Sequence, residues 1–208
     1  FAERLRSVEE RYWSLVADAR DDAGLEGAVL AAVAAEAPDP ATVFVSNSMP
    51  VRDLDRFGRP RSANLTVLGN RGASGVDGIT STALGAGSAT EDPLVLAVGD
   101  LAFYHDMNGL LAVERCGVDA TVVLVNNDGG GIFQMLPIAE HDPPFTDLFR
   151  TPHGLDFGPV GDLYGVEVAR VDGMDAFRAA YRESVTSDGT QVVEVVTDAA
   201  ESHRRRDA

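Results

Sequence analysis

The chain has 208 residues, 45% of them hydrophobic, which is enough for one α/β domain with a sizeable core. Its 33 acidic and 17 basic residues give a formal net charge of -16, which argues against nucleic acid and anionic membranes as partners. No apolar run reaches 18 residues, and the charged N-terminal stretch lacks the pattern of a signal peptide. The sequence therefore predicts a cytoplasmic protein without a membrane span.

Apart from the histidines, every basic residue is arginine, and the acidic excess is spread along the chain. This composition is typical of proteins from salt-adapted organisms, and we interpret the halophile-like acidic surface as serving solubility rather than partner binding. The single cysteine, Cys116, excludes an internal disulfide framework and a multi-cysteine metal site. Because it lies in an apolar, helix-like stretch, we expect it to be a buried small hydrophobic residue.

The N-terminal part is predicted to be helical. Residues 1–20 carry apolar side chains at steps of three and four among charges, which indicates an amphipathic helix. We expect residues 1–23 to be a linker from an upstream domain. A second helix is predicted from about Gly24 to Ala37, ended by Pro38-Asp39-Pro40, and residues 42–45 are predicted to form a short buried strand.

From there strands and helices alternate. Further strands are predicted at residues 64–68, 94–98, 121–125, 165–170 and 191–196, and helices at 49–57, 77–89, 101–115 and 174–187. Short, nearly continuous apolar strands separated by helices predict an α/β fold, a doubly wound and mainly parallel sheet with helices on both faces. We expect residues 24–197 to form this domain, residues 141–159 a mobile loop, and residues 198–208 a tail in which Arg204-Arg205-Arg206 is disordered.

Polar and glycine-rich segments follow four of the predicted strands. They are Ser46-Asn47-Ser48, Gly69 to Gly75, Gly99-Asp100, and Asn126 to Gly131. In doubly wound sheets, ligands bind outside the carboxyl ends of the strands. These segments therefore indicate one composite site.

Two of these segments predict a magnesium site with a diphosphate attached. Asp100 and an Asn of the Asn126-Asn127 pair offer one charged and one neutral oxygen to a hard cation. The glycines at 129–131 allow the backbone to approach phosphates, and helix N-termini after Gly99 and Gly130 aim N–H groups at an anion. The alternative interpretation is an ordinary turn with a helix cap, followed by a flexible loop.

Taken together, the two segments resemble the Gly-Asp-Gly to Asn-Asn signature of thiamine-diphosphate enzymes, with Leu101 in place of the final Gly. A narrower resemblance is carried by four segments, Ser46-Asn47-Ser48-Met49-Pro50-Val51-Arg52-Asp53, Gly69-Asn70-Arg71-Gly72-Ala73-Ser74-Gly75-Val76-Asp77-Gly78, Gly99-Asp100-Leu101 and Asn126-Asn127-Asp128-Gly129-Gly130-Gly131-Ile132-Phe133. These segments resemble the menaquinone-pathway synthase family MenD, the 2-succinyl-5-enolpyruvyl-6-hydroxy-3-cyclohexene-1-carboxylate synthases, in which Leu at position 101 is similar. The likeness covers about residues 24–197.

This resemblance implies roles for individual residues. Asp100, Asn127 and the carbonyl of Gly129 would hold Mg²⁺. The cofactor thiamine diphosphate would be bound by Val76, Gly99, Asp100, Leu101, Asn127, Gly129, Gly130, Gly131 and Ile132, with Val76 supporting its bent conformation. Ser48, Arg52 and Arg71 would face the reaction centre, and Ile132 with Phe133 would form its apolar wall.

The resemblance implies 2-oxoglutarate and isochorismate as substrates. Both are dicarboxylates, which call for fixed cationic groups, and Arg52 and Arg71 are the candidates. The alternative for a loop arginine is a solvated charge or a local salt bridge. The histidines at 105, 141, 153 and 203 show no metal-ligand spacing and receive no catalytic role, and the least implausible of them is His105, near the start of a helix beside the metal loop.

In the family, a Glu from an N-terminal pyrimidine-binding domain of the same or neighbouring subunit activates the cofactor. No segment for that domain is present in these residues. We therefore expect a C-terminal fragment that is not catalytic alone, and a homodimer or homotetramer when the protein is full length.

Two alternatives stay open. The first is another thiamine-diphosphate enzyme, such as an acetolactate synthase or a 2-oxoacid decarboxylase. The second is a non-catalytic binding module that keeps the fold. A nicotinamide-binding enzyme fits poorly, because no G-x-G-x-x-G follows the first strand.

Overall fold

The computed structural model describes residues 1–20 and 26–206. The strands are β1 (Ala41–Val45), β2 (Leu65–Leu68), β3 (Leu94–Gly99), β4 (Ala120–Asn126), β5 (Glu167–Val171) and β6 (Gln191–Val196). The α-helices are α1 (Ala2–Arg20), α2 (Glu26–Glu36), α3 (Met49–Phe57), α4 (Ile79–Gly87), α5 (Asp100–Asp106), α6 (Leu111–Cys116), α7 (Pro159–Tyr164), α8 (Met174–Ser184) and α9 (Ala199–Arg206). Shorter helical turns are η1 (Met107–Leu110), η2 (Gly131–Met135), η3 (Pro137–Glu140) and η4 (Thr146–Arg150).

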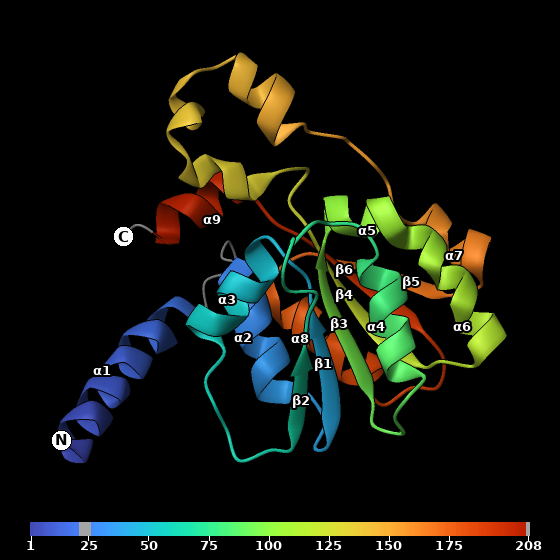
Figure 1. Cartoon of the computed structure of the whole chain (residues 1–208), viewed down its shortest axis with the longest axis horizontal. Coiled ribbons are helices and arrows are strands. Elements are labelled where there is room, and N and C mark those ends of the chain that lie inside the picture. Colours follow the sequence, from blue (N-terminus) through green and yellow to red (C-terminus); the bar gives the residue numbers. More distant parts are fainter. Residues whose placement is uncertain (21–25, 207–208) are drawn as a thin grey trace.

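The strands of the described residues form one parallel six-stranded sheet in the order β2-β1-β3-β4-β6-β5. The sheet confirms the predicted doubly wound α/β class (Figure 1). From β1 the chain builds outward to β2 on one side and then to β3 and β4 on the other. The strand order therefore reverses between β1 and β3, and this switch point is where such sheets bind ligands.

Helices cover both faces of the sheet because the central strands are apolar on both sides. Along β3, Val95 and Ala97 contact the cluster that includes α2 and α8, whereas Leu94, Leu96 and Val98 contact the cluster that includes α4 and α5. These side chains are almost fully buried. Burying one such Val or Leu contributes about 1.5–3 kcal/mol, so the two layers fix the position of the strand ends.

The amphipathic helix predicted at the N-terminus is confirmed as α1. Most of its apolar stripe is exposed, whereas Val16 is buried and Trp13 packs against the same core. Figure 1 shows α1 extending away from the sheet. The predicted boundary between residues 23 and 24 lies outside the described residues. Within residues 1–20 and 26–206, no helix combines the length and apolarity needed to cross a membrane.

The prediction of a disordered C-terminal tail at Arg204-Arg205-Arg206 is wrong. Residues Ala199–Arg206 form α9, and the guanidinium of Arg206 is buried between the carboxylates of Glu26 and Asp53. These carboxylates belong to α2 and α3, which are far from Arg206 in the sequence, so no local pattern predicted the contact.

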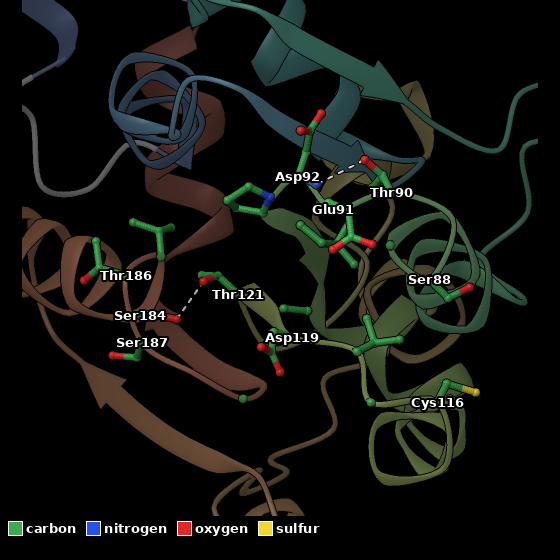
Figure 2. Close-up of a pocket in the computed structure, with 18 residues that line it drawn as sticks. Ser88, Thr90, Glu91, Asp92, Cys116, Asp119, Thr121, Ser184, Thr186 and Ser187 are labelled. Carbon is green, nitrogen blue, oxygen red and sulfur yellow. Dashed lines mark hydrogen bonds between the residues drawn. The ribbon is translucent and has the colours of Figure 1, made fainter.

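The prediction of a buried Cys116 is also wrong, because its side chain is exposed. Cys116 is the last residue of α6, and the chain turns away at Gly117, whose φ of 60° is left-handed. Figure 2 shows its sulfur directed away from the neighbouring side chains. Cys116 therefore lies at the exposed end of α6, a helix in which no residue is fully buried.

The loop predicted at residues 141–159 is partly helical. It contains η4, and its last residue, Pro159, begins α7. Phe145 and Phe157 are buried at its two ends. Two buried aromatic side chains and polar contacts to the loop after β4 attach this segment to the rest of the domain. Its mobility stays a prediction.

Candidate functional site

Strands β3 and β4 end side by side and place Asp100 and Asn127 at one edge of the sheet. Gly99 pairs with Val125 in the parallel register, so the next residues of each strand meet there. The buried Asp100 carboxylate accepts N–H groups from Leu101 at 2.6 Å, from Asn127 at 3.1 Å and from Gly129 at 2.9 Å. One carboxylate thus fixes the loop after β4 to the end of β3.

The side-chain amide of Asn127 has a hydrogen-bond partner for its nitrogen but none for its oxygen. Its Nδ2 donates to Oε1 of Glu26 at 2.7 Å, whereas its buried Oδ1 has no hydrogen-bond partner among the described residues. An unpaired buried oxygen costs about 1–3 kcal/mol. A hard cation is the kind of ligand that would supply the missing partner.

The glycine loop after β4 is closely packed from behind. Gly129 has a φ of 129°, and a Cβ there would lie 2.2 Å from the carbonyl oxygen of Arg150. A Cβ at Gly130 would lie 2.5 Å from the carbonyl oxygen of Phe149. Glycine is therefore required by the packing of this loop as well as by any phosphate that approaches it.

The side chain of Arg150 holds the same loop by bonding to the loop's backbone carbonyl oxygens. No sequence pattern indicated this contact. Its guanidinium donates to the carbonyl oxygens of Asn127, at 2.9 Å, and of Asp128. In return, Oδ1 of Asp128 accepts the N–H groups of His153 at 2.9 Å and Gly154 at 2.7 Å. The bond from Gly154 is the main reason that the pKa of Asp128 lies below its usual value.

His153 is the histidine that reaches the site, although the sequence gave it no role. Its Nε2 lies 3.2 Å from Oδ2 of Asp100, and its Nδ1 accepts the N–H of Leu155 at 3.0 Å. His105, which the sequence placed beside the metal loop, is exposed on α5. The fold of the preceding segment, rather than any spacing of histidines, brings His153 to Asp100.

A cavity of about 120 Å³ opens at this edge, between the ends of β1, β3 and β4. It brings together most of the predicted site residues, namely Ser48, Val76, Gly99, Asp100, Leu101, Asn127, Gly129, Gly130, Gly131, Ile132 and Phe133. Pockets that enclose a whole drug-sized ligand measure about 300–1,000 Å³. This cavity has room for one end of a cofactor.

The family model for the "Thiamine pyrophosphate enzyme, C-terminal TPP binding domain" matches residues 53–195. The chain belongs to this family.

Several curated relatives are similar over nearly the whole chain. Three of them are named 2-succinyl-5-enolpyruvyl-6-hydroxy-3-cyclohexene-1-carboxylate synthase. The one from Halobacterium salinarum is 66% identical over 96% of the chain, that from Haloarcula marismortui 64% over 99%, and that from Roseiflexus castenholzii 49% over 99%. The chain covers 34% of the first two relatives and 36% of the third, so it spans about a third of their length.

Two solved enzyme structures share the fold. Benzoylformate decarboxylase from Polynucleobacter necessarius matches with a TM-score of 0.69 at 21% identity, over 84% of this chain and 33% of that one. The thiamine diphosphate-dependent 4-hydroxybenzoylformate decarboxylase of Rhodococcus jostii matches with a TM-score of 0.67 at 23% identity, over 85% of this chain and 33% of that one. At this identity the likeness supports the fold of the thiamine pyrophosphate enzyme domain.

The donor set of this thiamine pyrophosphate enzyme domain fits a magnesium diphosphate. In residues 1–20 and 26–206, no cluster of three or more His, Cys, Asp or Glu side chains forms a self-contained metal site. The cavity is lined instead by the unpaired amide oxygen of Asn127 and by the carboxylates of Asp100, Glu26 and Asp53, of which Glu26 and Asp53 are paired with Arg206. Mg²⁺ is commonly bound in this way, by one or two protein oxygens together with substrate phosphates and water.

The two predicted substrate arginines lie at the rim of this cavity rather than within it. The exposed Arg52 donates to the carbonyl oxygen of Ser48 at 2.6 Å, and the exposed Arg71 donates to Oδ1 of Asn47 at 2.8 Å. Asn47 is buried and donates to the carbonyl oxygen of Gly75 at 2.7 Å. Both arginines are therefore attached to the segment after β1, where Ser48 has a strained φ of 68°.

Proposed function

We propose that this chain is the diphosphate-binding and magnesium-binding domain of a thiamine-diphosphate-dependent transferase. The synthase would decarboxylate 2-oxoglutarate and add the remaining four-carbon unit to isochorismate in menaquinone biosynthesis. The observation that carries the proposal is that the carboxylate of Asp100 and the unpaired Oδ1 of Asn127 belong to residues that line the same cavity. The names of the relatives from Halobacterium salinarum and Haloarcula marismortui support the choice of reaction.

Thiamine diphosphate, when bound, supplies the nucleophilic carbon and the electron sink for decarboxylation. Asp100, Asn127 and the carbonyl of Gly129 would hold its Mg²⁺. The backbone of Gly99–Leu101 and Gly129–Ile132 would bind its diphosphate, and Val76 would support its bent shape. Ile132 and Phe133, which line the cavity, would exclude water from the reacting carbon.

Arg52 and Arg71 would bind the substrate carboxylates. Their guanidinium groups are tethered to the segment after β1, and exposure leaves donors available at the rim. A charge-assisted bond from a fixed guanidinium to a carboxylate is about twice as strong as a neutral hydrogen bond. On an otherwise acidic chain, two such groups beside the cofactor would select dianionic substrates over neutral ones.

The rest of the site would come from a second domain. The cavity is small and the chain spans about a third of its relatives, which supports a shared site. We propose that a pyrimidine-binding domain of the same or neighbouring subunit completes it, in a cytoplasmic homodimer or homotetramer. This chain alone would then bind cofactor without turning over substrate.

Calorimetric titration with thiamine diphosphate in high-salt buffer, with and without Mg²⁺, tests the metal site. We expect binding that requires Mg²⁺ and that Asp100→Ala abolishes. Asp106→Asn is the matched control, because Asp106 is also a buried aspartate of α5. Its carboxylate accepts hydrogen bonds from Ser81 and does not line the cavity. Its binding should stay within about threefold of the parent, and equal loss in both variants would contradict a specific role for Asp100.

The same titration is repeated on the chain joined to the remaining two thirds of the Halobacterium salinarum relative. Absence of metal-dependent binding in both forms would refute the cofactor assignment. With the joined protein, turnover of 2-oxoglutarate only in the presence of isochorismate supports the proposed reaction. Turnover of pyruvate without isochorismate would instead show an acetolactate-synthase-like enzyme.

A further inference from the structure

Three helices converge beside the proposed metal site and form a buried ionic network. It consists of Glu26 at the start of α2, Asp53 in α3 and Arg206 at the end of α9. Nη2 of Arg206 lies 2.8 Å from Oε2 of Glu26 and 2.7 Å from Oδ2 of Asp53, and its Nε donates to Oδ1 of Asp53 at 3.1 Å. Figure 1 shows α9 against the ends of α2 and α3.

Stability alone is a weak reason for such a network. The side chains of Glu26 and Asp53 are 2% exposed and that of Arg206 is 6% exposed, so all three charges have lost most of their water. The desolvation of buried ion pairs commonly cancels their attraction, and apolar residues of similar volume serve stability as well or better. The second oxygen of Glu26 indicates a different purpose.

That oxygen, Oε1, accepts Nδ2 of the proposed metal ligand Asn127 at 2.7 Å. An asparagine amide turned by 180° about its last bond exchanges its oxygen and its NH₂ group at almost no steric cost. A carboxylate has no proton to donate, so Glu26 accepts only the NH₂ group. This contact fixes Nδ2 towards α2 and leaves the unpaired Oδ1 as the atom available to a cation.

We propose that Glu26 is a positioning residue for Asn127, and that Arg206 positions Glu26, so that the C-terminal helix α9 sets the orientation of a metal ligand. The inference rests on the proposed function, because it requires Asn127 to bind Mg²⁺. Without Glu26, the amide would present its NH₂ group to the metal in part of the molecules. Outer partners of metal ligands typically contribute about 10- to 100-fold in metal affinity.

Glu26→Gln tests this orientation with little change in shape. With Arg206 present, the glutamine oxygen faces the guanidinium and its NH₂ group faces Asn127, which must turn its own oxygen away from the cavity. We expect the Mg²⁺ concentration needed for half-maximal thiamine diphosphate binding to rise about 10- to 100-fold. Glu36→Gln is the matched control, because Glu36 lies on the same helix and pairs with Arg182 and Arg178, outside the cavity.

A double variant separates positioning from a merely structural role. In Glu26→Gln with Arg206→Met, the guanidinium that dictates the glutamine orientation is absent, and the glutamine NH₂ can turn to Asp53 and its oxygen to Asn127. We expect Mg²⁺ affinity to recover at least threefold from the single variant, although the double variant is less stable. If the network were only structural, affinity would fall further with stability, and that outcome would overturn the proposal.

A measurement on the metal-free parent chain does not depend on any variant folding. Nuclear magnetic resonance should show one proton of the Asn127 side-chain amide protected from solvent exchange by the bond to Glu26. An unprotected amide, or unchanged Mg²⁺ affinity in a folded Glu26→Gln, overturns the inference and leaves the cofactor assignment standing. A protected amide without any metal-dependent cofactor binding, in the chain or the joined protein, refutes the proposed function instead.

Discussion

The sheet has a hollow at each end, and the larger one is the less suited to a ligand. At the amino ends of β3 and β4 a hollow of about 470 Å³ is lined by loops and by the ends of α4, α6 and α8, against about 120 Å³ at the carboxyl ends. Figure 2 shows the polar groups of the larger hollow, where Thr121 and Ser184 share a hydrogen bond of 2.7 Å. Among its described lining residues, no buried side-chain atom is left unpaired.

The smaller hollow differs in chemistry rather than in size. It contains the unpaired Oδ1 of Asn127, the strained backbone of Ser48 and the buried carboxylates of Asp100 and Glu26. Unpaired polar atoms and strain cost free energy in the empty protein, and they persist where a ligand compensates for them. The comparison supports the proposed site at the carboxyl ends, on the grounds of the topological switch point and unmet bonding capacity rather than of volume.

The largest expected difference between the two ends concerns glycine. Gly129 at the carboxyl end and Gly189 at the amino end both have positive φ, of 129° and 84°. A Cβ at Gly189 meets nothing within 4 Å, so Gly189→Ala should cost only the backbone penalty of about 1–2 kcal/mol. Gly129→Ala adds a collision with the carbonyl oxygen of Arg150, and we expect at least about 3 kcal/mol.

Chemical denaturation of both glycine variants measures this difference. Cofactor binding should fail in Gly129→Ala and persist in Gly189→Ala. Equal losses of stability in the two variants would mean that the loop after β4 relaxes away from Arg150. That outcome would contradict close packing at the carboxyl end.

A second difference is that a titrating group at the carboxyl end, Asp53, makes the free energy of unfolding depend on pH. Burial, as the largest cause, raises the pKa of Asp53 from 3.8 to about 6, against the opposing effect of Arg206. The folded state therefore holds this proton more tightly than the unfolded state. The stability that Asp53 contributes is present below pH 3.8 and is lost as the pH rises through about 6.

Asp53→Asn removes this titration. We expect the unfolding free energy of the variant, relative to the parent, to increase between about pH 4 and pH 6 and then level off. Urea denaturation across this range at constant salt measures it. Asp119→Asn, at the exposed amino end, controls for the removal of one acidic residue. A difference that stays flat with pH would show that the network carries no such titration.

The smallest expected effect is at Cys116, which lines the amino-end hollow. Because the thiol is exposed, a thiol reagent should modify it in the folded protein at a rate within about tenfold of the unfolded chain. Cofactor binding should change less than twofold after modification, since the residue lies at the opposite end of the sheet. Protection of the thiol, or loss of binding, would contradict the separation of the two ends.

The sequence by itself determined the architecture and the residues at the centre of the proposed site. Each predicted strand is present, because the strands are short runs rich in apolar and β-branched residues and bounded by turn residues, a signal that local sequence carries. The association of Asp100 with Asn127 followed as well, since consecutive parallel strands place their carboxyl ends together. Most of the predicted cofactor residues line one cavity for the same reason.

Only the tertiary structure decided which distant groups support that centre. Arg206 lies 180 residues from Glu26, and the buried contact between them required the whole sheet to be wound before α9 could reach α2. His153 and Arg150 reached the loop after β4 only through the folded segment before α7. Such contacts have no period and no local motif, because they depend on where the chain returns in space rather than on its neighbouring residues.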